Sequence, residues 1–451
     1  VLPEGLEKVH GYGVTGLWSL EELSLPSSLT EIGERAFMGS AIRDITIPAG
    51  AVLGEGAFYG CSIGELTLSE GVTVGPYAFE NCVNLEKVNY PAQRIDIGNM
   101  AFADTPYLAG LYENGEGVVY VQDTAYAYLG TEPTVTVRAG TRRIGENFLS
   151  GAGAAVTEVS LPDGLLEIGD YAFAGSAISE LIVPESVQRF GVQIADGCEN
   201  LRKVTTPSPE TWMNGSGAVD AHGYSFGNFP LEELILTGTG RFVGAGYEET
   251  LRRVTVGEGI TVIGTIAFSV HTVLEEVILS EGLQEIEDSA FYGCTALAQL
   301  EIPASVHTLG RTVLGASDGR LVIPENAQLV NFRDDLCDPL DELLQTQAAG
   351  TPVYLGRCLY GIARAEEAST GEFTVREGTV RIGDRAFSGM QSLRRVVLPG
   401  SLREIGSGAF SECGSLSEIV LPDGLEKIGS GAFFGCAALE EIDLPESVTE
   451  I

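Results

Sequence analysis

Histidine and cysteine, the residues that most often serve as bases, nucleophiles or metal ligands, are sparse in this sequence of 451 residues. None of the four histidines has the H-E-x-x-H spacing of a zinc site, and no two cysteines form a C-x-x-C pair. No G-x-S-x-G, phosphate-binding or dinucleotide-binding motif stands out either. The sequence therefore predicts no catalytic residue, no metal site and no cofactor. The histidines are interpreted as solvated residues on the surfaces of turns: His10, His222, His271 and His307.

Most of the cysteines occupy one recurring position, just before the apolar residue that opens the next repeat. Such a position suits a small buried residue, and cysteine acts there as a compact hydrophobe. Ser40 and Thr105 take the same position in other repeats, so free thiols are predicted even though adjacent turns bring Cys61 towards Cys82 and Cys413 towards Cys436. A disulfide between the two outlying cysteines, Cys337 and Cys358, is left open. The six in the recurring position are Cys61, Cys82, Cys198, Cys294, Cys413 and Cys436.

Negative charge dominates the composition, with 63 Asp and Glu against 26 Lys and Arg and a formal net charge of −37. Such a chain repels nucleic acid and anionic membrane faces. The acidic run from Asp334 to Glu342 lacks the D-x-D-x-D-G spacing of a calcium loop, so it is interpreted as solvated charge. Apolar residues make up 44% of the chain, which excludes a disordered protein. No apolar run approaches the roughly 20 residues that span a bilayer, so direct membrane insertion is not expected.

These residues are set in a repeat of about 23 residues. Leu274, Val277 and Leu279 begin one copy, and the same pattern restarts at Leu297. A 0, 3, 5 spacing of apolar residues places the last two on the same face of a strand of period two. An Ala-Phe pair marks ten copies, with phenylalanines Phe37, Phe58, Phe79, Phe102, Phe173, Phe268, Phe291, Phe387, Phe410 and Phe433.

One repeat alone leaves two apolar sides open, and stacked repeats cover each other. The predicted fold is therefore a leucine-rich-repeat solenoid, related to the α/β horseshoe. It would be a right-handed coil with a parallel β-sheet on one face, built of strands and turns with little helix. One continuous solenoid is expected over residues 1–451. The repeat pattern is interrupted at about 106–133, 206–230 and 324–370.

The three interruptions differ in character. Residues 106–133 predict a β-hairpin, and residues 324–370 predict a short helix followed by another hairpin. The segment 206–230 is rich in loop-forming residues yet carries Trp212, Tyr224 and Phe229. Aromatic residues on a long loop are candidate binding residues. The alternative is that they fold back and pack on the solenoid.

Outward positions of successive predicted strands alternate in charge. Positive and negative pairs follow each other at 202–203, 232–233, 252–253 and 275–276. One interpretation is a self-neutralised ladder, because stacked opposite charges stabilise a sheet. The other makes the arginines cationic stripes that bind acidic partners; the candidate residues are Arg252, Arg253, Arg394 and Arg395.

The consensus sequence of the repeat is L-x-x-I-x-L-P-x-x-L-x-x-I-G-x-x-A-F-x-x-C. It closely resembles the BspA-like leucine-rich repeats of bacterial surface proteins. The resemblance covers most of the chain. It implies a secreted or cell-surface location and binding to a protein ligand, such as a host matrix protein or another bacterial surface protein. Both ends fall within the repeat pattern, so further repeats or caps are expected beyond them.

The predicted function is therefore that of a non-enzymatic scaffold, extracellular or at the cell surface, for protein–protein interaction or adhesion. Two alternatives are retained. One is a carbohydrate or cell-wall binding module that uses the aromatic loop at 206–230, and the other is a rigid spacer for another domain.

Overall fold

The computed structural model describes residues 2–114, 117–207, 229–244, 249–324, 327, 331–332, 344–345 and 347–451. Its backbone contacts group into two compact units. The first holds Val1–Arg202 with Thr211–Phe229, and the second holds Lys203–Glu210 with Pro230–Ile451. Each unit is built from parallel strands stacked turn upon turn, as the repeat predicts.

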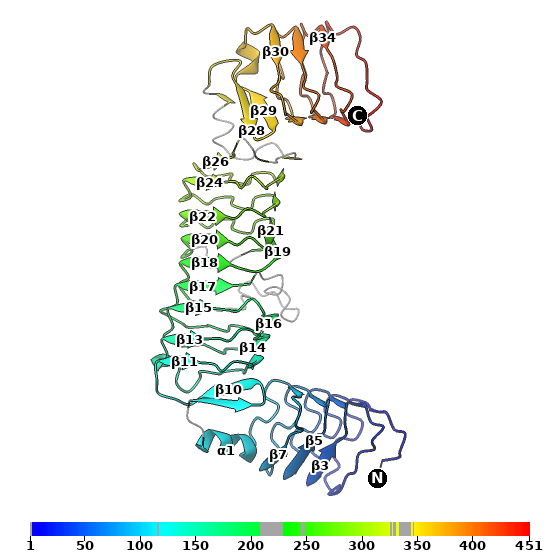
Figure 1. Cartoon of the computed structure of the whole chain (residues 1–451), viewed down its shortest axis with the longest axis vertical. Helices are drawn as coiled ribbons and strands as arrows, with labels where there is room; N and C mark the ends of the chain where they lie inside the picture. Colours follow the sequence, from blue (N-terminus) through cyan, green and yellow to red (C-terminus); the bar gives the residue numbers. More distant parts are fainter. Residues whose placement is uncertain are drawn as a thin grey trace. The chain divides into compact units, whose positions relative to one another are not determined.

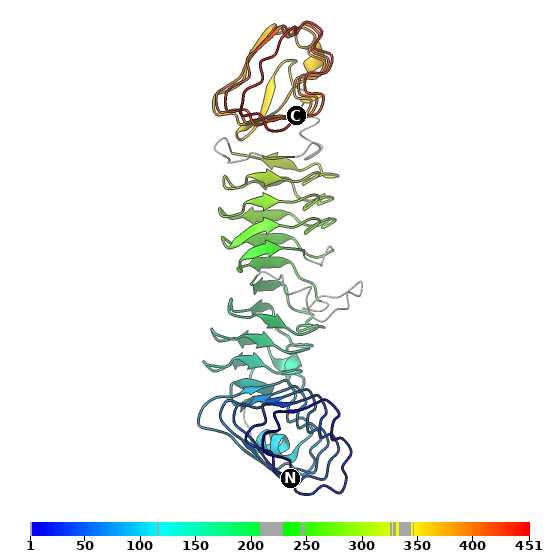
Figure 2. The ribbon, with the colours of Figure 1, turned by 90° about the vertical axis from the view of Figure 1, so that its right-hand side faces the viewer.

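Unit one begins with a stack of coils that carries two parallel sheets. The strands predicted from the 0, 3, 5 spacing form the first sheet, and a row of two-residue strands at the x-x-Ile-Gly step, which was not predicted, forms the second. Figure 2 looks almost along the stacking direction of these blue turns, which lie one over the next. The first sheet is β3 (Asp44–Ile47), β5 (Glu65–Leu68) and β7 (Lys87–Asn89); the second is β1 (Lys8–Val9), β2 (Glu31–Ile32), β4 (Val52–Leu53), β6 (Thr73–Val74) and β8 (Asp96–Ile97).

A helix and a hairpin then interrupt the coil, and a second stack follows within the same unit. The hairpin predicted at 106–133 is confirmed, whereas the helix before it was not predicted (Figure 1). The elements are α1 (Pro106–Asn114), β9 (Val118–Val121), β10 (Thr124–Tyr128), β11 (Thr134–Thr136), β12 (Arg143–Ile144), η1 (Gly153–Ala155), β13 (Glu158–Ser160), β14 (Glu167–Ile168), β15 (Glu180–Ile182) and β16 (Arg189–Phe190).

In its described residues, unit two repeats this architecture, with two rows of parallel strands and an antiparallel hairpin of β28 (Pro352–Leu355) and β29 (Cys358–Ile362). That hairpin confirms the one predicted in 324–370, while most of the helix predicted there lies outside the described residues. The strands before it are β17 (Lys203–Thr206), β18 (Glu233–Leu236), β19 (Gly240–Phe242), β20 (Arg253–Val256), β21 (Ile260–Ile263), β22 (Glu276–Leu279), β23 (Glu285–Ile286), β24 (Gln299–Glu301), β25 (Thr308–Leu309), β26 (Arg320–Val322) and β27 (Asn331–Phe332).

The hairpin and the turns after it close the described chain (Figure 1). These elements are β28 (Pro352–Leu355), β29 (Cys358–Ile362), η2 (Ala365–Glu367), β30 (Glu372–Thr374), β31 (Arg381–Ile382), β32 (Arg395–Val397), β33 (Glu404–Ile405), β34 (Glu418–Ile419) and β35 (Lys427–Ile428).

The repeat phenylalanines form ladders in the core, as predicted. Phe37 and Phe58 stack with ring centroids 5.1 Å apart, and the next rings follow at 5.4 Å and 5.8 Å. In the second unit Phe268 stacks on Phe291 at 5.3 Å, and Phe387 stacks on Phe410 at 4.9 Å. Within each ladder, successive rings stack on one another, so the core runs along the stack of turns.

Each turn makes its corners with residues in the left-handed backbone region. One corner lies directly before the Ala-Phe pair and the other two residues after the phenylalanine; in the turn of Phe268 these residues are Ile266 (φ 55°) and Val270 (φ 58°). Glycine takes the second corner in the next turn, at Gly293 (φ 74°). β-branched residues at such angles are strained, so the stack tolerates a local cost to keep its coil regular.

Candidate interaction surface

The outer faces of β17, β18, β20 and β22, which are four strands of a five-stranded sheet, carry the alternating charges predicted from the sequence. Backbone register places Lys203 beside Glu233, Glu233 beside Arg253, and Arg253 beside Glu276. The intervening residues point inward, because the side chains of a strand alternate between its two faces. Val204, for example, is buried in β17.

Ion pairs connect these charges along the column. Arg253 Nε lies 2.6 Å from Glu276 Oε2, and the hydrogen bond to Glu276 is the main cause of a raised pKa at Arg253. The contacts of Glu233 with Lys203 and Arg253 are looser, at 3.9 Å each. One column over, Arg252 lies 2.6 Å from Glu275. Pairs this exposed contribute little to stability because water and salt screen them, and they support the interpretation as a self-neutralised ladder.

A column of β-branched residues runs beside the charges on the same face. Thr205, Ile235, Thr255 and Ile278 lie in register on the four strands. Ile278 is 46% exposed. Isolated surface hydrophobes of this kind are ordinary.

The C-terminal sheet of β30, β32 and β34 has a similar face with only three rungs. Arg395 pairs with Glu418 at 3.0 Å and lies in register with Glu372. Its neighbour Arg394 is exposed and makes no ion pair within the described part of the chain. An apolar column lies beside them, with Val397 42% and Val420 74% exposed.

The aromatic loop contributes less than the sequence suggested. Phe229 is only 5% exposed and lies in the core, which favours the packing alternative for that residue. Trp212 and Tyr224 lie outside the described residues. A different aromatic residue, Trp18, is 82% exposed in the described part of the chain. Trp18 was not among the predicted binding residues, because it lies outside the three interruptions of the repeat.

The prediction of a solvated His271 is wrong. Its side chain is 1% exposed and packs edge-on against Phe268, with ring centroids 5.8 Å apart. His271 stands three residues after Phe268, which is the recurring position that Cys294 fills in the next turn. This position is buried in both turns, so the burial of His271 follows from its position in the repeat although its side chain is polar.

The cysteines of the recurring position carry free thiols, as predicted. Each thiol contacts the carbonyl of a phenylalanine in the preceding turn; Cys61 Sγ lies 3.1 Å from Phe37 O, and Cys294 Sγ lies 3.1 Å from Phe268 O. Burial raises the pKa of Cys61 to about 11 and that of Cys294 to about 12. These thiols are therefore poor nucleophiles. Cys337 lies outside the described residues, so its bridge to Cys358 stays a prediction.

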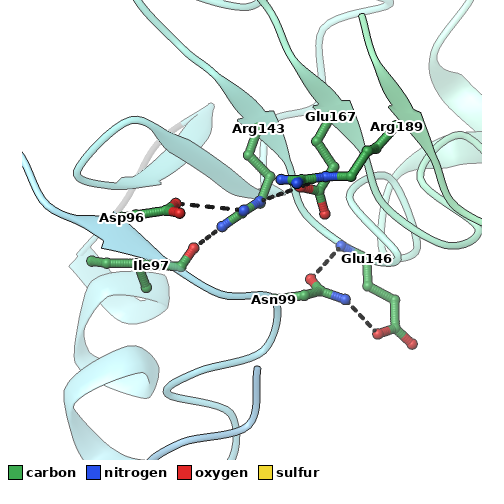
Figure 3. Close-up of polar contacts among 7 residues, drawn as sticks. All are labelled: Asp96, Ile97, Asn99, Arg143, Glu146, Glu167 and Arg189. Atoms are coloured by element: carbon green, nitrogen blue, oxygen red, sulfur yellow. Dashed lines mark hydrogen bonds and ion pairs between the residues drawn. The ribbon is translucent and has the colours of Figure 1, made fainter. Parts of the chain in front are cut away.

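A polar joint in unit one spans the first interruption (Figure 3). In regular turns the carbonyl of the second-row strand accepts a glycine N–H from the next turn, as Ile32 O does from Gly54 at 2.7 Å. After β8 no such turn follows directly, and the Arg143 guanidinium donates to Ile97 O instead. The same guanidinium lies 3.1 Å from Glu167 and 3.5 Å from Asp96. Arg143 thus replaces a missing backbone donor.

The two hairpins prove to be copies of one module. Tyr120 and Tyr354 each accept a hydrogen bond of 2.9 Å from a backbone N–H, that of Arg138 and Arg376 respectively. Each arginine also places its guanidinium over the tyrosine ring, at 3.8 Å and 4.2 Å from the centroid. The similarity of the two modules is visible in the sequence, where TVRAGTRRIG at 136–145 and TVREGTVRIG at 374–383 follow the two hairpins.

Other potential sites are weaker. An acidic pocket of about 240 Å³ is lined by Thr265, Glu285, Glu287 and Asp288 among others. Arg241 forms a bidentate ion pair with Glu287, which lowers the pKa of that carboxyl. Within the described ranges no cluster of His, Cys, Asp and Glu is placed to hold a metal ion. In the same ranges no helix has the length and apolar character needed to cross a membrane.

The family model described as the BspA type leucine rich repeat region matches residues 1–109, 119–247, 244–318 and 365–451 in six copies. The chain belongs to this family. The matches include the repeat phenylalanines of both units; the gap at 319–364 contains the second hairpin, whereas the first hairpin lies almost wholly within the match at 119–247. Solenoids of this family are generally non-catalytic scaffolds.

Several solved structures are similar to this chain. One from Bacteroides ovatus is 20% identical over 99% of this chain and 78% of its own, with a TM-score of 0.28. A leucine-rich cell surface protein from Faecalibacterium prausnitzii is 23% identical over 73% and 86%, with a TM-score of 0.26. The pneumococcal vaccine antigen PcpA is 16% identical over 100% and 90%, with a TM-score of 0.23. No curated protein matches this chain.

Proposed function

We propose that this BspA-type repeat protein is a non-enzymatic scaffold that binds a protein ligand at the cell surface or in the extracellular medium. The observation that carries the proposal is the face of the C-terminal sheet. There the exposed cation of Arg394, which has no ion-pair partner in the described part of the chain, directly precedes β32, the strand that carries the exposed Val397, and the exposed Val420 directly follows the neighbouring strand β34. A surface location is supported by membership of the BspA-type family, whose repeats are typical of bacterial surface proteins.

The chemistry of this face suits a folded protein ligand. Arginine is enriched among the residues that contribute most to binding at protein interfaces, and the buried core of an interface is more apolar than its rim. Arg394 is ready to form a new ion pair with an acidic residue of the ligand, whereas Arg395 already pairs with Glu418. We therefore expect Arg394 to contribute more to binding than Arg395.

The test is binding of the full chain to a panel of matrix proteins and surface proteins by biolayer interferometry, beside a glycan array. Arg394→Glu and Val420→Asp are expected to weaken binding of a protein ligand by about tenfold or more. Arg395→Glu is the matched control, with a smaller expected effect. Trp212→Ala and Tyr224→Ala are expected to leave that binding unchanged.

Two outcomes oppose this proposal. Binding to glycans that is lost in Trp212→Ala, with no protein bound, would support the carbohydrate alternative. The absence of binding to any member of either panel would favour a spacer.

A further inference from the structure

The left-handed corners of unit two are unusual in the residues that they hold. Among the described residues of the chain, three β-branched residues have a positive φ, and all three lie within successive turns: Ile266 (φ 55°), Val270 (φ 58°) and Thr312 (φ 46°). This backbone region costs a β-branched residue more than it costs glycine. Backbone strain of this kind clusters at sites that bind ligands or do chemistry.

Two of these side chains are exposed, so burial in the core does not explain them. Ile266 is 62% exposed and Val270 is 52% exposed, and Tyr292 in the next turn is 40% exposed. The coil does not need an apolar side chain at these corners. Glycine takes the position of Val270 in the next turn, at Gly293, and the position of Ile266 in a later turn is also a glycine, Gly408. The chain therefore keeps two strained apolar residues on its surface where glycine would also complete the turn.

Ile266, Val270 and Tyr292 are neighbours on this surface, and we call them the apolar ridge. Strand β21, labelled in Figure 1, leads into the first of its turns. The Ser269 N–H donates to Ile266 O at 3.0 Å and closes the tight turn between Ile266 and Val270. The Val270 N–H donates to Tyr292 O at 2.7 Å, so these two residues lie side by side on adjacent turns.

The acidic pocket of about 240 Å³ lies next to the apolar ridge. Its lining includes Thr265, the residue before Ile266, together with Glu285 and Asp288. The Ile266 N–H donates to Asp288 O at 3.0 Å, which joins the ridge to the pocket through the backbone. The Asp288 side chain accepts the Arg311 N–H at 2.8 Å, and this bond fixes the orientation of the carboxylate.

We propose that the apolar ridge and this pocket together bind a protein partner that presents an apolar side chain next to a lysine or arginine. Charge complementarity argues for this occupant. Of the three carboxylates that line the pocket, Glu287 already pairs with Arg241. Glu285 and Asp288 make no ion pair within the described part of the chain, so two negative charges remain for a cation of the partner.

The two halves of the site set different demands on the partner. The apolar side chain covers the ridge and removes Ile266 and Val270 from water, which favours binding in proportion to the area buried. The cation selects against acidic partners, because like charges placed together are unfavourable. This preference is opposite to that proposed for Arg394, so the two surfaces are expected to bind different ligands.

The contact is small, so we expect a dissociation constant in the micromolar range or above. The probe is a set of short synthetic peptides in which leucine or phenylalanine is followed by arginine, by glutamine or by glutamate. Binding to the full chain is measured by fluorescence anisotropy. The wild type should bind the arginine peptides about tenfold or more tightly than the glutamate peptides. This preference should shrink as salt rises, because salt screens exposed charges.

Val270→Gly separates binding from stability. It removes an exposed side chain and relieves the left-handed strain, so it should unfold no earlier than the wild type yet bind the arginine peptides about tenfold or more weakly. Tyr292→Ala should weaken binding of the same peptides. Glu285→Gln should weaken the arginine peptides and leave the glutamine peptides unchanged.

The matched control is Glu412→Gly. Glu412 has φ 60° and takes the position of Val270 in a C-terminal turn, two residues after the repeat phenylalanine. This variant should bind the peptides like the wild type. Arg394→Glu should also leave peptide binding unchanged, so a failure here and a failure of the proposed ligand binding by the C-terminal face are distinguished.

Three results would overturn the proposal. The first is a wild type that binds none of the peptides, and the second is equal binding of arginine and glutamate peptides. The third is a Val270→Gly variant that binds the arginine peptides as tightly as the wild type does.

Discussion

At the scale of single residues, the position within the turn decides what a side chain experiences. His271 occupies the position that Cys294 takes in the next turn, and it is buried as Cys294 is. Val270 occupies the position that Gly293 takes in the next turn, and it has the same left-handed backbone conformation. Both residues depart from the type that their position favours. The burial and the backbone conformation of these two residues are therefore set by their position in the turn and not by the type of side chain.

Val270→Gly is expected to stabilise the protein by about 0.5–1 kcal/mol. A β-branched residue is strained at φ 58°, and the relief exceeds the entropy that glycine adds to the unfolded chain. The matched control is Gly293→Val, at φ 74°, which should lose about 1–2 kcal/mol. The midpoint of urea unfolding measures both changes. A destabilised Val270→Gly variant would show that the corner is not strained.

At the scale of elements, the hairpin is the unit that starts a stack. β9 pairs antiparallel with β10, and β10 then offers its other edge to the parallel strand β12. β28, β29 and β31 repeat this arrangement. Each hairpin thus ends in a strand edge that the next regular turn can extend. The Tyr–Arg contact fixes the hairpin to that turn.

Tyr354→Phe is expected to cost about 0.5–1.5 kcal/mol, because the Arg376 N–H loses its acceptor while the guanidinium stays over the ring. Arg376→Ala loses the ring contact and the hydrogen bond to Gly356 O, and should cost more. Denaturant unfolding of both single variants and the double variant gives the coupling energy. A coupling near zero would mean that the two residues act separately.

The sequence predicts the elements well where the repeat is regular. The 0, 3, 5 spacing placed Val277 on a parallel strand and Phe291 in the core, because both follow from burial of one face. It did not predict α1 or the second row of strands, since two-residue strands such as Glu31–Ile32 carry too little alternation to detect. The charged face was visible in the sequence, but its ion pairs required the register of the strands.

At the scale of the whole molecule, one position repeated along the coil gives a collective response to pH. Burial raises the pKa of Cys61 to about 11, and those of Cys294 and Cys413 to about 12. An unfolded thiol ionises near pH 8.5, so above that pH the unfolded chain binds fewer protons than the native one. The free energy of unfolding must then fall as pH rises.

Stability is expected to decrease from about pH 8.5 towards pH 11, by up to about 1.4 kcal/mol per pH unit for each buried thiol. The variant Cys61→Ser/Cys294→Ser should show a shallower fall, since serine already occupies this position at Ser176. Urea unfolding at a series of pH values measures the slope. Equal slopes for the variant and the wild type would contradict the assignment to thiols.

The hairpin modules also bear on how such a chain changes length. A block of turns that brings its own starting strand does not depend on the block before it for hydrogen-bond register. Duplication or loss of a complete hairpin-led block therefore preserves the strand pairing within the remaining blocks and removes only contacts at the joint, such as that of Arg143 with Ile97 O, whereas a cut within a block exposes a phenylalanine ring of the ladder. Insertions and deletions among related proteins are therefore expected to begin and end at the hairpins, so that the chain lengthens or shortens by complete hairpin-led blocks.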